Sequence, residues 1–292
     1  MMENLIEKIQ MSEFDFLVFF IDLIYIMFAT IICIRFAGYF ANFKFEQLAR
    51  NNSHAFNIIL ICSYIFFIVL ISANILHHAM HESFLNCLLS IILYTLLVII
   101  VMLSRKPIAL INAAPDFIFA QNSQENEASQ LYDSISFIAS GIAISGILYY
   151  FYELSLVSIF LLCISVEFSL ELVFRTVMVL NLTNLKKLVL GHNLRLIGTA
   201  SILKLHFSLI FIALAGLVDI SEDSGILIFL TWLLVSIILF FIITGITFLL
   251  EKLLFKNTNI LYILHKDTDY TIIVARFVLL LSFDLATMIL LN

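Results

Sequence analysis

The chain has 292 residues, of which 63% are hydrophobic and only 12% are charged, and its formal net charge is −6. A soluble domain usually has about a quarter of its residues charged, so this chain has too little polar surface to cover a water-soluble fold. The negative charge is small and scattered, and the lack of a basic stripe excludes nucleic acid as a partner. Composition therefore indicates an integral membrane protein whose first partner is the lipid bilayer.

Long apolar stretches follow one another along the chain, and most reach the roughly 20 residues that a helix needs to cross the hydrocarbon core. They are continuous, whereas the strands of a membrane barrel alternate between apolar and polar residues. We therefore predict an all-α, polytopic helical membrane bundle of about eight transmembrane helices. The predicted helices span residues 15–36, 55–76, 84–104, 134–152, 155–180, 197–218, 225–250 and 270–291.

Lysine and arginine are concentrated in every second connection between these helices. The connections near 77–83, 153 and 219–224 contain none, whereas the alternate connections hold eleven of the fifteen basic residues. Basic loops remain in the cytoplasm, so both termini are predicted to lie outside. The eleven residues are Arg35, Lys44, Arg50, Arg105, Lys106, Lys186, Lys187, Arg195, Lys252, Lys256 and Lys266.

The same pattern contains an internal repeat. In both 35–48 and 175–188 an arginine precedes a leucine by thirteen positions, and a polar cluster follows. Each repeated unit consists of one helix, a basic connection and a returning helix. We predict four helical hairpins in two pseudo-repeated halves, which cover residues 1–153 and 154–292.

The polar clusters after the basic connections, Asn51-Asn52 and His192-Asn193, open the next predicted helices. Asparagine satisfies free N–H groups at helix starts, so simple capping is one interpretation. The alternative is that the clusters line a cytoplasmic vestibule and bind a polar ligand or a partner.

These segments also carry a family resemblance. Phe45-Glu-Gln-Leu-Ala-Arg-Asn-Asn-Ser-His-Ala55 resembles the signature of the YjfL-like family of small bacterial inner-membrane proteins: a basic residue, two or three asparagines, then small residues entering a helix. Leu190-Gly-His-Asn193 resembles a second copy. Because family members usually have four helices, the resemblance implies a tandem duplication and a bacterial inner-membrane location. The family has no established activity, so the resemblance implies none here.

Several ionisable residues fall inside the predicted helices, where charge is costly and suggests function by default. At 1.5 Å per residue, Glu167, Lys204 and Arg276 come out about 10–12 Å from the cytoplasmic side, and Asp22 and Asp284 about 10 Å from the outer side. We predict that Glu167 pairs with Lys204 or Arg276, and that Asp22 and Asp284 share an outer site. The pairs either mark a proton or ion route or only fix the helix register. The full set is Asp22, Glu167, Glu171, Lys204, Arg276 and Asp284.

No enzyme motif occurs in the chain, so we expect no catalytic residue, cofactor or metal site. One functional hypothesis, slightly favoured because no pore-lining set is visible, is a non-enzymatic component that maintains the envelope or docks a cytoplasmic protein. Its basic connections and the acidic loop 125–127 would form the docking surface. The alternative is an ion- or proton-coupled transporter or channel that uses the intramembrane charges. Small residues along the fourth helix suit tight contact within one chain or in a homo-oligomer.

Overall fold

The computed structural model describes residues 23–32, 55–79, 84–112, 127–152, 154–180, 194–215, 225–254 and 270–291. These residues form helices and short connections without any strand, so the all-α prediction is confirmed for them. Leu23–Ile32 is a short helical segment. The labelled helices are α4 (Ala55–Ala79), α5 (Phe84–Asn112), α7 (Glu127–Tyr150), α8 (Leu156–Leu180), α10 (Leu194–Ala215), α11 (Gly225–Leu254) and α13 (Tyr270–Leu291).

The helices lie where the apolar runs predict them, with two notable extensions. Helix α5 continues through Pro107 to Asn112, eight residues beyond its predicted end. Helix α7 begins at Glu127, seven residues before its predicted start and inside the hydrophilic stretch. Hydropathy missed this first part of α7 because it contains polar residues such as Gln130, which is buried in the bundle.

Four of the helices contain a stretch that is long and apolar enough to cross a membrane, which makes this chain a membrane protein. Shorter apolar stretches occupy Leu23–Ile32 and parts of α5, α10 and α13. The four long stretches are Ile59–Leu76 of α4, Gln130–Tyr150 of α7, Leu156–Val173 of α8 and Leu230–Thr247 of α11.

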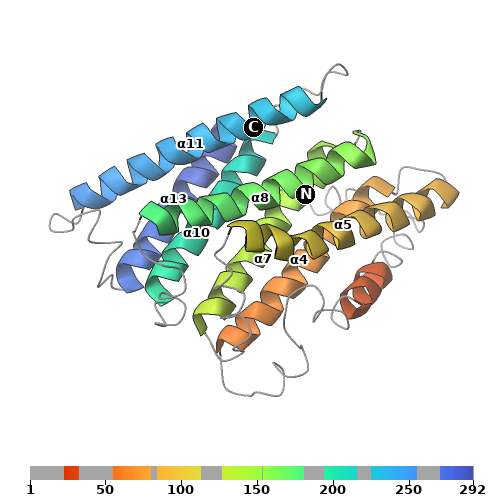
Figure 1. The fold of residues 1–292 in the computed structure, drawn as a ribbon, viewed down its shortest axis with the longest axis horizontal. Helices are drawn as coiled ribbons and strands as arrows, with labels where there is room; N and C mark the ends of the chain where they lie inside the picture. The colour runs from red at the N-terminus through yellow and green to blue at the C-terminus, as the bar shows by residue number, and fades with distance from the viewer. Residues whose placement is uncertain are drawn as a thin grey trace, which may run out of the picture.

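The helices are arranged in two layers (Figure 1). Helices α4, α7, α10 and α13 lie side by side in one row, in which each packs against the next. Helices α5, α8 and α11 cross in front of this row, and successive helices of the chain alternate between the two layers. The predicted boundary between two halves falls between α7 and α8, and α7 packs against both α8 and α10. The pseudo-repeated halves therefore remain a prediction.

Helix α7 packs closely against its neighbours because its inner face is built from small residues. A Cβ atom added to Gly141 would lie 3.3 Å from the Cα of Phe67 on α4, and one added to Gly146 would lie 2.7 Å from Cγ1 of Ile212 on α10. Small residues let membrane helices approach closely enough for backbone and side-chain packing to hold them together. The tight contact expected of this helix occurs within the chain.

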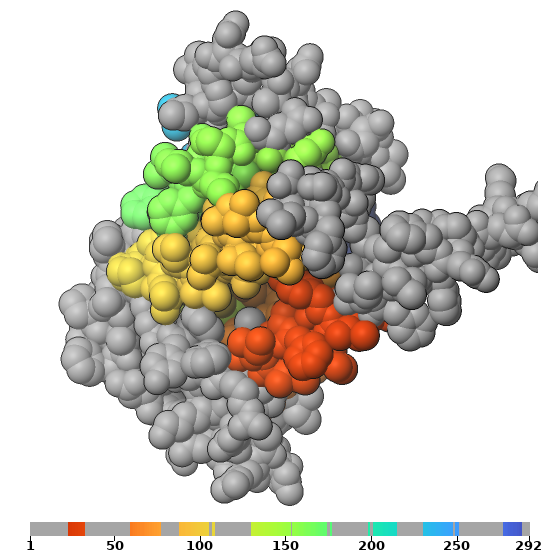
Figure 2. All heavy atoms as spheres, turned by 90° about the vertical axis from the view of Figure 1, so that its right-hand side faces the viewer, coloured from red at the N-terminus to blue at the C-terminus, as the bar shows by residue number. Residues whose placement is uncertain are grey.

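The outer layer presents apolar side chains to its surroundings. Large exposed hydrophobic residues are numerous on α5, α11 and Leu23–Ile32, whereas Ser201–Leu214 of α10 has none. The short segment lies against α4 and α5 on one side of the molecule (Figure 2), where Tyr25 and Thr95 share a 2.9 Å hydrogen bond. Exposed apolar faces suit contact with lipid, and α10 is a central helix that packs against α7, α8, α11 and α13.

Candidate functional site

Helix α10 carries two buried ionisable side chains, Lys204 and His206, on opposite sides. Residues two positions apart on an α-helix point about 200° apart and differ by about 3 Å in height. Helix α10 packs against α7 and α8 as well as α11 and α13. Lys204 contacts residues of α7 and α8, whereas His206 contacts α11 and α13.

Lys204 lies in a hydrogen-bonded cluster with residues of two other helices. Its Nζ is 2.6 Å from Oε1 of Glu171 on α8, and it donates 3.0 Å hydrogen bonds to the hydroxyl oxygens of Tyr132 and Ser136 on α7. The Tyr132 hydroxyl in turn lies 2.8 and 2.7 Å from the two carboxylate oxygens of Glu171. Nζ also lies 4.3 Å from the centre of the Tyr132 ring, within range of a cation–π interaction.

The partners of Lys204 match its chemistry. An ammonium group has three N–H donors and no acceptor, and three acceptors surround this one: a carboxylate and two hydroxyls. Lys204 is 1% exposed, and the side chain of Glu171 is 10% exposed, so the cluster is removed from bulk solvent. The carboxylate balances the ammonium charge, and we refer to Lys204, Glu171, Tyr132 and Ser136 as the lysine cluster.

The second site pairs His206 with Asp284 of α13. The Nδ1 and Oδ1 atoms lie 2.7 Å apart, and each side chain is 1% exposed. Phe240 of α11 lies against the imidazole with ring centres 5.3 Å apart. The contact is short enough for an ion pair but is not directed as a hydrogen bond. The two ring nitrogens and both carboxylate oxygens have no hydrogen-bond partner. We call this the histidine–aspartate pair.

Several other buried polar side chains bond to their own helix. Ser63, Ser134, Ser236 and Thr247 each donate a hydrogen bond to the carbonyl oxygen four residues earlier in their own helix. A hydroxyl that bonds its own helix needs no partner elsewhere. Unlike them, the lysine cluster and the histidine–aspartate pair join separate helices.

The structure modifies the predicted pairing. The carboxylate next to Lys204 is that of Glu171, one turn along α8 from Glu167, which is itself buried at 2% exposure. Asp284 contacts His206, two positions from Lys204 on α10. The outer site that Asp284 is predicted to share with Asp22 remains a prediction, because Asp22 lies outside the described residues. Because α10 begins at Leu194, three residues earlier than predicted, Lys204 and Asp284 are about 15 and 21 Å along their helices, a smaller difference than expected.

Several predicted positions lie outside the described part of the chain. Arg276 belongs to α13, eight positions before Asp284, but its side chain is not among those described. The acidic residues 125–126 and most of the basic connections are also outside, although Arg105, Lys106, Arg195 and Lys252 fall within the described helices. Also outside are Asp22, Asn51, Asn52, His192 and Asn193.

Sequence reasoning missed His206, Tyr132 and Ser136. His206 is an ionisable residue inside an apolar run, a signal that was available at the start. Tyr132 and Ser136 are four positions apart on one face of α7, but Tyr132 precedes the start predicted for that helix. Their link to Lys204 depends on how α7 and α10 face each other, and the sequence does not show that.

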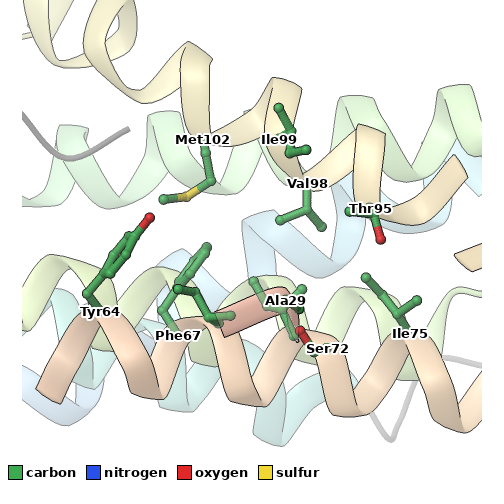
Figure 3. Close-up of a pocket in the computed structure, with 11 residues that line it drawn as sticks. Ala29, Tyr64, Phe67, Ser72, Ile75, Thr95, Val98, Ile99 and Met102 are labelled. Atoms are coloured by element: carbon green, nitrogen blue, oxygen red, sulfur yellow. The ribbon is translucent and has the colours of Figure 1, made fainter. Parts of the chain in front are cut away.

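An apolar cavity of about 60 Å³ lies apart from both sites, between Leu23–Ile32, α4 and α5 (Figure 3). Phe67 and Ile75 of α4 and Val98 and Met102 of α5 are among its lining residues. No ionisable acid or base lines it, apart from the phenol of Tyr64. An apolar cavity of this kind stays dry, so it offers no route to the buried charges.

No known protein family, curated protein or solved structure matches the chain. The resemblance to the YjfL-like family therefore remains a prediction.

The described ionisable groups inside the bundle are suited to exchanging protons. Three carboxyl groups, one ammonium and one imidazole are buried: Glu167, Glu171, Asp284, Lys204 and His206. Carboxylate and imidazole groups can each bind and release a proton. No group of three or more metal-ligating side chains occurs among the described residues.

Proposed function

We propose that the protein is a multi-pass membrane transporter or channel that moves protons, alone or coupled to a solute, through ionisable groups on both sides of α10. The observation that carries this proposal is that the lysine cluster and the histidine–aspartate pair lie about 3 Å apart in height on the same central helix. Ionisable residues inside a membrane bundle are costly and mark proton and ion pathways. We infer no enzymatic activity.

A purely structural role explains one site better than the other. Well-packed apolar residues hold helices together as well as a buried ion pair does, and often better. A buried polar network rigidifies a core best when all of its members are hydrogen-bonded. The lysine cluster meets that condition, whereas four polar atoms of the histidine–aspartate pair have no hydrogen bond. The docking hypothesis depends on loops outside the described residues, so it remains a prediction without further support.

We further propose that the chain crosses a bacterial inner membrane eight times with both termini outside. The alternation of basic and non-basic connections supports this topology. In a chain whose native cysteines are replaced by serine, a membrane-impermeant maleimide applied to intact cells should label Ser83→Cys and Ser221→Cys. It should leave Arg50→Cys and Lys187→Cys unlabelled until the membrane is opened. Labelling of position 50 or 187 from outside would rule the topology out.

Flux in liposomes tests the proposed function. Vesicles that contain the purified chain should dissipate an imposed pH gradient faster than protein-free vesicles, as measured with an enclosed pH-sensitive dye. Asp284→Asn should reduce the rate to that of protein-free vesicles, because a neutral amide cannot balance the charge that His206 gains when it binds a proton. The matched control is Ser282→Asn, an exposed position on the same helix, which should keep the parent rate. No flux in the parent would reject the proposal.

A further inference from the structure

We propose that the histidine–aspartate pair is the proton-binding site of this protein and that the lysine cluster beside it keeps one protonation state. This inference deepens the proposed function, because it names the groups that hold the proton. It rests on a difference in hydrogen bonding between the two sites, which occupy opposite sides of α10. The ammonium of the lysine cluster has three acceptors, whereas the polar atoms of the histidine–aspartate pair have no hydrogen-bond partner.

Adding a proton to the lysine cluster is unfavourable. All three ammonium donors have acceptors, and the Tyr132 hydroxyl donates to Glu171. Adding a proton to Glu171 would leave the buried ammonium of Lys204 without its opposite charge. Breaking one side of a buried pair costs several kilocalories per mole, so this cluster keeps one protonation state.

The histidine–aspartate pair, by contrast, can bind and release a proton. An imidazole accepts a proton on a ring nitrogen, and histidine is the side chain that ordinarily changes charge near neutral pH. With one proton bound, an imidazolium faces a carboxylate and the pair is neutral. With the proton released, a neutral imidazole faces a carboxylate and the pair carries one negative charge. The 2.7 Å separation of Nδ1 and Oδ1 places an imidazolium and a carboxylate within ion-pair distance, which suits the protonated form.

The surroundings favour exchange of a single proton. On α11, the pair meets the uncharged Phe240 ring, and the hydroxyl oxygen of Thr244, one turn further along, is buried without a hydrogen-bond partner. The only described ionisable residue of α13 is Asp284 itself. The described titratable groups on the other elements packed against α10, and on α10 itself, are Tyr132, Asp133, Tyr149 and Tyr150 of α7, Cys163, Glu167 and Glu171 of α8, and Lys204. Within this set the charges of Lys204 and Glu171 balance each other, and Glu167 and Asp133 are the remaining carboxyl groups.

Infrared difference spectroscopy on the purified full chain tests the assignment. Spectra recorded between about pH 5 and 8 should contain one imidazole band and one aspartate carboxylate band that change together. Surface aspartates ionise below this range, so they contribute little. Both bands should disappear in His206→Gln and Asp284→Asn and persist in the double variant Lys204→Met/Glu171→Gln. Helical circular dichroism and a single elution peak establish that each variant is folded.

Two further measurements keep the proposal open to rejection. The parent labelled with ¹³C-aspartate needs no substitution, and the lack of a pH-dependent aspartate band in it would overturn the assignment. A band that follows sodium concentration at fixed pH would also overturn it. If the pH-dependent imidazole and aspartate bands are present but the liposomes show no proton flux, the result supports the proton-binding site and rejects transport. Flux that survives Asp284→Asn would support transport and reject this site.

Discussion

Replacing Lys204 by methionine should lower the free energy of unfolding by about 3–5 kcal/mol, because it leaves the carboxylate of Glu171 buried without its opposite charge. The ammonium is 1% exposed and 2.6 Å from that carboxylate, so solvent cannot replace it. The double variant Lys204→Met/Glu171→Gln should recover most of the loss, because an amide is neutral and still accepts a hydrogen bond from Tyr132. Chemical denaturation of the detergent-solubilised protein at neutral pH measures all three free energies.

The matched control for this substitution is Leu205→Met, at the next position of α10 and only partly buried. A volume-conserving apolar exchange costs less than about 1.5 kcal/mol. If Lys204→Met were no more destabilising than Leu205→Met, or if the double variant lost the sum of both single losses, the lysine cluster would not be a coupled pair.

Replacing Trp232 by alanine should lower the free energy of unfolding by about 3–5 kcal/mol, the range for removal of a large buried aromatic ring. Trp232 joins α11 to α10: its ring lies 3.6 Å from that of Phe211, and its Nε1 donates a 3.1 Å hydrogen bond to the Phe211 carbonyl oxygen. Phe151, which follows the last residue of α7, also packs on the Trp232 ring, with ring centres 4.9 Å apart. The same denaturation assay measures the loss.

Leu234→Ala provides the control for the tryptophan. It lies two positions away on α11 and is 58% exposed, so its removal should change the free energy of unfolding by about 0.5 kcal/mol or less. Equal losses for Trp232→Ala and Leu234→Ala would contradict the arrangement of α11 against α10. The result matters for the proposed site, because Phe240 on this same helix covers His206.

The sequence predicted the helices well because a helix that lies in the hydrocarbon core needs a continuous run of apolar residues. The order in which the helices pack does not follow from these runs. Helix α7 is the most buried of the four long apolar stretches, yet it is the least apolar of them, and α11 is far more apolar and far more exposed. In a membrane bundle the most apolar faces meet lipid, whereas small and polar residues such as Ser136 and Gly146 lie between helices.

The candidate site was predicted in part. Position along a helix follows from counting residues, and this singled out Lys204, Glu171 and Asp284 as intramembrane charges. The direction in which each side chain points around its helix, relative to a neighbour, depends on tertiary packing. For that reason the partner of Asp284 is His206, a residue that depth alone did not select.

Proton flux in liposomes that contain two variants tests the central claim most directly. We predict that Lys204→Met/Glu171→Gln, in which the lysine cluster is neutral, retains a flux close to that of the parent chain. Asp284→Asn, in which only the histidine–aspartate pair is changed, should show none above protein-free vesicles. The opposite pattern, with flux lost in the double variant and kept in Asp284→Asn, would contradict the claim that His206 and Asp284 carry the proton.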